Sequence, residues 1–271
     1  LDEFSLNTKT SLLYTPQLGK KHLFTANMSF LTPDYRSTIQ GLSSTNTASS
    51  YLQDPTVPSR TLTGDAKSIT TQTRSIGGLI QANYMLLEKY VVAASVRGDG
   101  NSRFGPDNRY GIFPAFSAAW QIGRENFLKD IRQIKDVKLR ASWGRSGNAP
   151  RRDYSYINVY KTYDYAYLGE NGVYSSNLEL ADLKWETVTQ QNLGLDVDMF
   201  DYRLTFGAEV YKKRTTDLMM DKIQIPTYNG FSEISMNVGT MDNDGWEASL
   251  NVVPVRNKKW DVSFNFNIAH N

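Results

Sequence analysis

The sequence contains no cysteine and only two histidines, His22 and His270. Without cysteine the chain forms neither disulfides nor thiolate metal sites. Neither histidine has a second histidine nearby in the sequence, so each is interpreted as a structural residue rather than a metal ligand or a general base. The sequence therefore predicts no metal site, no catalytic site and no cofactor.

Long apolar runs and an excess of charge of one sign are also missing. The mean hydropathy is −0.47, and no stretch approaches the roughly 20 apolar residues of a transmembrane helix. The formal net charge is +2 over 271 residues, which gives no electrostatic reason to propose nucleic acid as a partner. No nucleophile elbow, zinc signature or phosphate-binding glycine loop occurs, so an enzyme is not predicted.

Apolar and polar residues alternate along residues 192–217, in two runs joined at Phe200-Asp201. A period of two is the period of a β-strand, and the tight connection predicts an antiparallel hairpin. One face is apolar and consists of Leu193, Leu195, Val197, Met199, Tyr202, Leu204, Phe206, Ala208 and Val210.

The same alternation recurs along most of the chain. Further runs cover residues 4–14, 24–30, 137–143, 246–252 and 260–268. Most are close to the 9–11 tilted residues with which a strand crosses a bilayer, whereas strands of soluble sandwiches have a mode near 5–6 residues. The sequence therefore predicts an all-β fold, an antiparallel transmembrane β-barrel segment with about ten strands.

The connections between the predicted strands differ in length, and the difference orients the sheet. Short connections are residues 15–21, 86–89, 200–201 and 254–259, and the intermediate segment 123–136 is predicted to hold a short helix through Phe127, Leu128, Ile131 and Ile134. Long connections are residues 32–71, 98–108, 147–184 and 216–237, of which 41–71 is rich in Ser and Thr and is predicted to be irregular. Outer-membrane barrels keep short turns in the periplasm and long loops outside the cell.

Each face of the predicted strands has its own expected environment. Predicted to face the lumen are Arg140, Asp196, Asp198, Arg203, Glu209, Asn265 and Asn267. Predicted to face lipid are Leu204, Phe206, Val262, Phe264 and Phe266, and candidates for the interfacial belts are Trp120, Trp143, Trp246 and Trp260.

The segment from Arg152 to Tyr174 is dense in tyrosine. Aromatic rings with a polar tip suit a ligand-contact surface, which makes Tyr163, Tyr165, Tyr167 and Tyr174 the candidate substrate-binding residues. The alternative is that these tyrosines form an interfacial girdle or pack the loop. The sequence leaves both interpretations open.

Both ends of the chain fall at predicted strands. The sequence begins at Leu1, without an initiator methionine, and stops at Asn271. Unpaired strand edges would expose backbone donors and acceptors that lipid cannot satisfy. We therefore expect the complete protein to continue in both directions.

Six segments carry a specific resemblance. They are SVRGDGNSRFGPDNRYGIFPAFSAAW at 95–120, DVKLRASWGRSGN at 136–148, LKWE at 183–186 with NLGLD at 192–196 and YKK at 211–213, and the stretch 238–247. In this order they resemble consecutive barrel strands of the SusC/RagA-type TonB-dependent outer-membrane transporters. The similarity extends from about Ile76 to the end, and residues 1–75 match less clearly.

The resemblance implies a larger barrel of the 22-stranded class that is plugged by an N-terminal domain. Residues 1–271 would belong to the β-barrel domain, and the plug, through which TonB acts, would lie outside this chain. In this family a SusD-like surface lipoprotein covers the extracellular mouth, and the pair imports glycans, oligosaccharides or peptides across the cell outer membrane.

Three classes of function therefore remain in view. The first is TonB-dependent active import of a glycan or peptide nutrient with a SusD-like lipoprotein, in contact with outer-membrane lipid. The second is a passive porin or surface adhesin on a similar barrel. The third is a soluble β-sandwich that binds glycans through the tyrosine-rich segment, an alternative that the long alternating strands disfavour.

Overall fold

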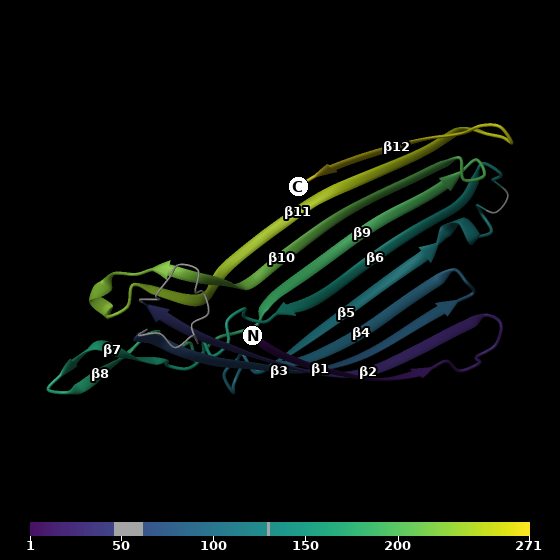
Figure 1. Ribbon diagram of the computed structural model, residues 1–271. Helices are drawn as coiled ribbons and strands as arrows, with labels where there is room; N and C mark the ends of the chain where they lie inside the picture. Colours follow the sequence, from purple (N-terminus) through teal and green to yellow (C-terminus); the bar gives the residue numbers. More distant parts are fainter. Residues whose placement is uncertain (46–61, 129–130) are drawn as a thin grey trace.

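The computed structural model describes residues 1–45, 62–128 and 131–271, and its main feature is one antiparallel sheet of ten strands (Figure 1). The order in the sheet is β1-β2-β3-β4-β5-β6-β9-β10-β11-β12. The first six strands are β1 (Asp2–Tyr14), β2 (His22–Thr45), β3 (Leu62–Leu86), β4 (Tyr90–Asn101), β5 (Tyr110–Gln121) and β6 (Ile134–Asn148). The last four are β9 (Glu186–Met199), β10 (Leu204–Gln224), β11 (Glu233–Arg256) and β12 (Asp261–His270).

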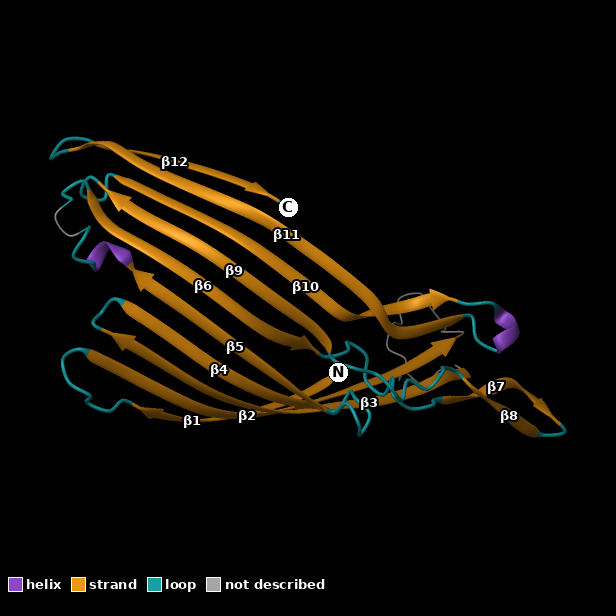
Figure 2. Ribbon diagram, turned by 180° about the vertical axis from the view of Figure 1, so that it is seen from behind, coloured by secondary structure: helices purple, strands orange, loops and turns teal. Residues whose placement is uncertain are grey.

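Strands that follow one another in the sequence lie side by side, with one exception. Between β6 and β9 the chain forms a separate two-stranded sheet of β7 (Tyr160–Tyr167) and β8 (Glu170–Ser175). Figure 2 shows the long strands as one curved, inclined wall rather than two packed layers. The predicted all-β, antiparallel barrel segment of about ten strands is therefore confirmed, and the described part of the chain is not a β-sandwich.

Helical structure is limited to two short 3₁₀ segments in the described ranges, η1 (Ile122–Arg124) and η2 (Thr227–Asn229). No helix among the described residues is long and apolar enough to cross a membrane.

The register aligns apolar side chains in rows across the sheet. In the β9–β10 hairpin, Phe206 lies opposite Val197, and Val210 lies opposite Leu193. Leu193 in turn lies opposite Ala141 of β6, so the row continues into the next strand. Because successive side chains of a strand point to opposite faces, this register gathers the apolar residues on one face. Leu193 is 50% exposed there, as expected for a face that meets a partner other than water.

The opposite face carries charge. Arg140 of β6 forms ion pairs with Asp196 of β9 at 3.1 Å and with Glu209 of β10 at 2.5 Å. Nearer the turn of the β9–β10 hairpin, the Thr205 hydroxyl donates a hydrogen bond to Asp198 at 2.7 Å. The polar residues predicted for the lumen on these strands therefore lie on one face and interact across strands.

The β9–β10 turn is longer than predicted. It comprises residues 200–203, and Phe200, Asp201 and Tyr202 have φ values of 53°, 57° and 61°. Left-handed backbone of this kind turns a hairpin tightly. Tyr202 and Arg203 were predicted to continue the strand, and this was wrong because both lie in the turn.

Several predicted long connections are largely strand, so their predicted lengths were wrong. β2 and β3 occupy the described parts of segment 32–71, and residues 46–61 lie outside the described residues. β4 continues to Asn101, and the β10–β11 connection contains only residues 225–232. In β10 the register with β11 shifts on both sides of Leu218, and Asp217 and Lys222 have φ values of 53° and 57°. Such bulges break the alternation by which a strand is read from sequence.

The helix predicted through Phe127, Leu128, Ile131 and Ile134 was also wrong. Phe127 and Leu128 lie in a turn, Ile134 begins β6, and residues 129–130 fall outside the described residues. The Leu128 amide donates to the Glu125 carbonyl, and the Ile131 amide to the Leu128 carbonyl. These bonds span three residues, as in single turns, and so short a segment has little intrinsic helical stability.

Candidate ligand-capture site at the long-loop end

The two ends of the sheet differ in their longest connection, which is residues 149–185 at one end and residues 122–133 at the other. We call the end with the β2–β3, β4–β5, β6–β9 and β10–β11 connections the long-loop end, and the opposite end the short-turn end. The β6–β9 connection, residues 149–185, is the longest whose residues are all described, and its β7–β8 hairpin projects beyond the sheet at the long-loop end (Figure 1). Candidate residues for ligand contact were predicted in this connection.

The β7–β8 hairpin is held at its tip and at its base. At the tip, Leu168 and Gly169 have φ values of 53° and 87°, the backbone of a tight two-residue hairpin turn. At the base, the Ser176 amide donates to the Val159 carbonyl at 2.7 Å. The Val159 amide donates to Asn177 Oδ1, also at 2.7 Å. The hairpin is therefore a defined arm whose two ends lie next to each other.

The four candidate tyrosines fall into two groups. The rings of Tyr163 and Tyr174 lie 4.6 Å apart between centroids. Tyr163 also covers Gly172, where an added Cβ would lie 3.2 Å from Tyr163 Cδ2. Tyr165 and Tyr167 are 85% and 81% exposed and have no aromatic partner among the described residues. The structure brings the first two together to stiffen the arm and leaves the other two open to contact.

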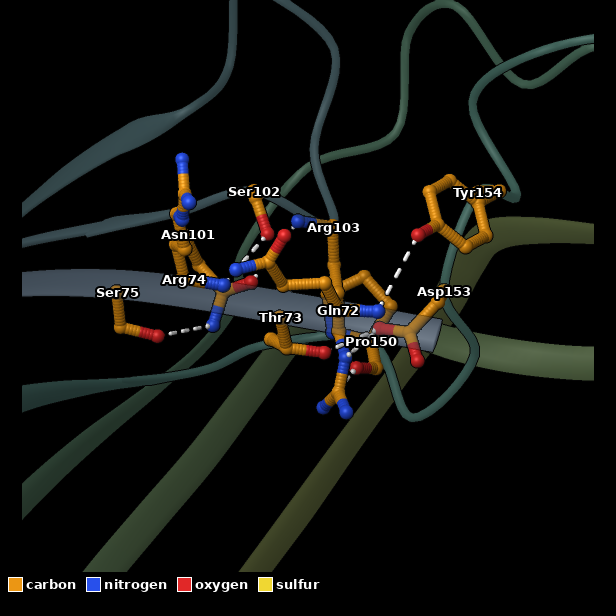
Figure 3. A network of polar contacts seen from close by, with 10 residues as sticks. All are labelled: Gln72, Thr73, Arg74, Ser75, Asn101, Ser102, Arg103, Pro150, Asp153 and Tyr154. Carbon is orange, nitrogen blue, oxygen red and sulfur yellow. Dashed lines mark hydrogen bonds and ion pairs between the residues drawn. The ribbon is translucent and has the colours of Figure 1, made fainter. Parts of the chain in front are cut away.

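A polar network fixes the start of the β6–β9 connection (Figure 3). Asp153 Oδ1 accepts hydrogen bonds from Thr73 Oγ1 of β3 and from Arg103 Nε, each at 2.7 Å. Arg103 also donates to the Pro150 carbonyl at 3.1 Å. The Arg103 side chain is 27% exposed and the Asp153 side chain 22% exposed, so this ion pair is better shielded from water than a surface pair. The network ties β3, the β4–β5 connection and the start of the β6–β9 connection together.

An aromatic cluster fixes the end of the same connection. Phe104 is fully buried and stacks on Trp185 with ring centroids 4.5 Å apart. Phe113 meets Trp185 edge-on at 5.5 Å, and Leu183 is buried. Gly147 allows this packing because a Cβ there would clash with the Phe113 ring. The cluster is a small hydrophobic core built at the rim of the sheet.

Asn237 of β11 adds a third attachment. Its Oδ1 accepts the Lys184 amide at 2.9 Å, and its Nδ2 donates to the carbonyls of Lys184 at 3.1 Å and Asp217 at 2.7 Å. One side chain thus joins the end of the β6–β9 connection to the bulge of β10. The connection is held at both ends, and the tyrosine-bearing arm extends between its fixed points.

The short-turn end carries a charged cluster in place of a loop core. Glu125, in the β5–β6 connection, accepts hydrogen bonds from Tyr90 at 2.6 Å, Lys89 at 2.9 Å and Trp120 at 3.2 Å. These bonds, that of Tyr90 first, lower the pKa of Glu125 to about 2. No group of three or more His, Cys, Asp or Glu residues able to hold a metal ion occurs in the described parts of the chain.

Sequence reasoning singled out the tyrosines and missed the residues that position them. Phe104, Phe113 and Trp185 lie within the segments quoted for the family resemblance, which was the available signal, but the resemblance assigned them no role. Asn237 and Asp153 carried no signal in the sequence.

Comparisons with known proteins agree with this architecture. The family model "TonB dependent receptor-like, beta-barrel" matches residues 2–270. A TonB-dependent receptor of Formosa agariphila is 37% identical over 188 residues, covering 69% of this chain and 18% of the relative. The TonB-dependent receptor SusC of Bacteroides thetaiotaomicron is 35% identical over 196 residues, covering 70% of this chain and 19% of SusC.

Solved structures give the same result. The RagAB peptide importer in its "closed-closed" state superimposes with a TM-score of 0.88 at 27% identity, covering 98% of this chain and 30% of that chain. The chain spans between 18% and 25% of the length of the curated relatives it matches.

Proposed function

The chain belongs to the TonB-dependent receptor-like β-barrel family, and on this basis we propose that it forms part of the wall of an outer-membrane importer driven by TonB. The observation that carries the proposal is the continuous antiparallel sheet, with aligned apolar side chains on one face and cross-strand ion pairs on the other. In such a sheet the backbone N–H and C=O groups form hydrogen bonds between strands, the apolar face contacts lipid, and the polar face contacts water in the lumen.

In this proposal the long-loop end lies outside the cell and the short-turn end in the periplasm. Residues 1–271 are part of the β-barrel domain, while the plug and the segment that contacts TonB are supplied by another part of the protein. The barrel as a whole is of the 22-stranded class. Energy from the inner membrane reaches the plug through TonB, and the captured solute is released into the periplasm.

A SusD-like surface lipoprotein is the proposed partner at the long-loop end. The similarity to SusC and to the RagAB peptide importer supports this partner and supports a glycan or a peptide as the imported nutrient. The exposed rings of Tyr165 and Tyr167 suit contact with the ligand or with the lipoprotein, because an apolar ring with a polar tip serves a half-wet interface. Tyr163 and Tyr174 hold the arm in shape beneath them.

Removing the arm tests its role in uptake. Residues 160–175 are replaced by a short Gly-Ser link, which the adjacent positions of Val159 and Ser176 allow without moving the rest of the connection. The barrel should fold, as judged by heat-modifiable migration on gels, and uptake of the native nutrient should fall. Normal uptake after the deletion would show that the arm only packs the loop and has no role in import.

A matched pair of variants separates the tyrosines from general surface effects. Tyr165→Ser with Tyr167→Ser should lower uptake or lipoprotein binding. Tyr228→Ser, which changes a tyrosine 86% exposed in the β10–β11 connection at the same end of the sheet, should leave both unchanged. Uptake that continues after TonB is deleted would favour the passive porin alternative over active import.

A further inference from the structure

A hollow of about 410 Å³ lies over the middle of the polar face, but a larger one, of about 940 Å³, opens at its long-loop end. The larger volume is near the upper end of the 300–1,000 Å³ typical of small-molecule sites. We call it the mouth hollow. It is lined by β2, β3, β4, β6, β9, β10 and both ends of the β6–β9 connection. Its charged and amide side chains include Arg97, Asp99, Asn148, Arg151, Glu186 and Asp221.

The wall of the mouth hollow is fixed by hydrogen bonds. Asn101 of β4 donates to Ser75 Oγ of β3 at 3.0 Å, and its Oδ1 accepts the Arg103 amide at 2.9 Å. The hollow therefore shares Asn101, Ser75 and Pro150 with the network around Asp153 (Figure 3). Groups held in this way need little ordering when a ligand binds, which favours affinity.

Part of the charge in the mouth hollow has no ion-pair partner among the described residues. Arg97 and Asp99 form an ion pair at 2.6 Å and compensate each other. Glu186 accepts a hydrogen bond from the neutral amide of Asn148 at 2.9 Å. Arg151 and Asp221 make no ion pair or side-chain hydrogen bond within the described ranges. Arg151 and Asp221 are exposed and Glu186 is half-buried, so one cation and two anions remain available to a charged solute.

The apolar lining also bears on the class of solute. Leu218 and Met219 line the hollow beside Trp185. The Trp185 ring is already stacked on Phe104 and met edge-on by Phe113, so it is a poor platform for a sugar ring. An uncharged glycan would also take water from the charged groups without supplying opposite charges, which is unfavourable. A peptide supplies both signs of charge, amide groups and apolar side chains.

We propose that the mouth hollow is a solute-binding subsite for peptides that carry a cationic group. The ammonium or guanidinium group faces Glu186 and Asp221, and a carboxylate or carbonyl faces Arg151. The inference rests on the proposed import function and narrows its substrate class from glycan or peptide to cationic or zwitterionic peptide.

Retention of a defined peptide pool tests the subsite. The full-length protein with its partners is incubated with an equimolar pool of tri- to octapeptides, and the retained peptides are identified by mass spectrometry. Peptides with Lys or Arg should be enriched roughly tenfold or more over uncharged ones, the ratio expected for charge-assisted hydrogen bonds. Glu186→Gln with Asp221→Asn should remove this enrichment, whereas Asp107→Asn, on the exposed β4–β5 connection, should preserve it.

A second variant keeps the test informative if the double variant fails to fold, as heat-modifiable migration would show. Arg151→Gln should retain the preference for cationic peptides and lose the preference for a free carboxylate. Equal enrichment of uncharged peptides, or equal competition by an uncharged tetrasaccharide such as cellotetraose, would overturn the inference. The proposed function is tested separately, by measuring TonB-dependent uptake of the native nutrient in cells. Absence of that uptake would contradict the proposed function, and its presence would support it, whichever peptides the protein retains.

Discussion

The polar cluster around Glu125 at the short-turn end and the network around Asp153 at the long-loop end differ in the range of their contacts. At the short-turn end, Leu87 and Glu88 form a tight turn with left-handed backbone. The side chains that donate hydrogen bonds to Glu125 lie at most 36 residues from it in the sequence. At the long-loop end, Thr73 meets Asp153 across 80 residues. The cluster around Glu125 joins β4 and β5 through their own connections, whereas the network around Asp153 joins β3 to the β6–β9 connection.

The two sets of contacts serve different purposes: one closes hairpins of the sheet, and the other supports a recognition surface. A hairpin needs only its own turn and the pairing that follows. A recognition surface needs a rigid support beneath it, and the aromatic cluster around Trp185 and the network around Asp153 supply that support. The variants that follow act on one end, the other, or the wall between them.

Truncation of the buried ring at the long-loop end should have the largest effect. Phe104→Ala removes a fully buried side chain and should destabilise the local packing by about 3–5 kcal/mol. Limited proteolysis should then cut the β6–β9 connection faster while the barrel stays folded. Phe127→Ala, which removes a ring 66% exposed at the short-turn end, should change little. Equal cleavage of the two variants would show that the cluster is not the support.

An arginine placed on the apolar face of the sheet should have the second largest effect. Phe264→Arg places a charge on the face proposed to meet lipid, which costs about 2–4 kcal/mol near the bilayer midplane. Asn265→Arg, the adjacent position of β12 on the polar face, should remain hydrated and assemble. Heat-modifiable migration of membrane fractions measures assembly. Equal tolerance at the two positions would contradict the assignment of the faces.

Loss of the Asp153 anchor should be milder than loss of Phe104. Asp153→Asn weakens the bonds to Thr73 and Arg103 and leaves a half-buried guanidinium without its anion, at a cost of about 1–3 kcal/mol. Hydrogen exchange near residues 150–154 should accelerate. Asp182→Asn, an exposed position in the same connection, is the control and should leave exchange unchanged.

The smallest effect concerns pH at the short-turn end. The pKa of Glu125 is lowered from 4.5 to about 2, chiefly by the hydrogen bond from Tyr90. A lowered pKa means that the stabilisation is fully present above about pH 4.5 and is lost as the pH falls toward 2. Glu125→Gln should therefore flatten the acid dependence of stability between these values in detergent. Identical acid unfolding of the two proteins would show that the cluster contributes nothing.

The fold was predictable where its cause is local. Alternation at Leu193–Val197 and the connection at Phe200 predicted a hairpin, and the register confirmed it. The bulges at Asp217 and Lys222 hid the extension of β10, because left-handed backbone interrupts a period of two.

The candidate site was predictable only in part, because most of its contacts join residues that are far apart in the sequence. Tyrosine density marked the arm, but neither the pairing of Tyr163 with Tyr174 nor the exposure of Tyr165 follows from it. Asn237 is invisible to sequence patterns, since its partner Lys184 lies 53 residues away. Contacts between strands that are not consecutive leave no periodic signal.

The central claim is that the sheet spans the outer membrane with its long-loop end outside the cell, and single cysteines test it most directly. This chain contains no cysteine, so Tyr165→Cys and Glu88→Cys introduce one reporter at each end. On intact cells a membrane-impermeant maleimide should label position 165 and leave position 88 unlabelled until the outer membrane is opened. Labelling at position 88 but not at position 165 on intact cells, or equal labelling at both, would contradict the claim.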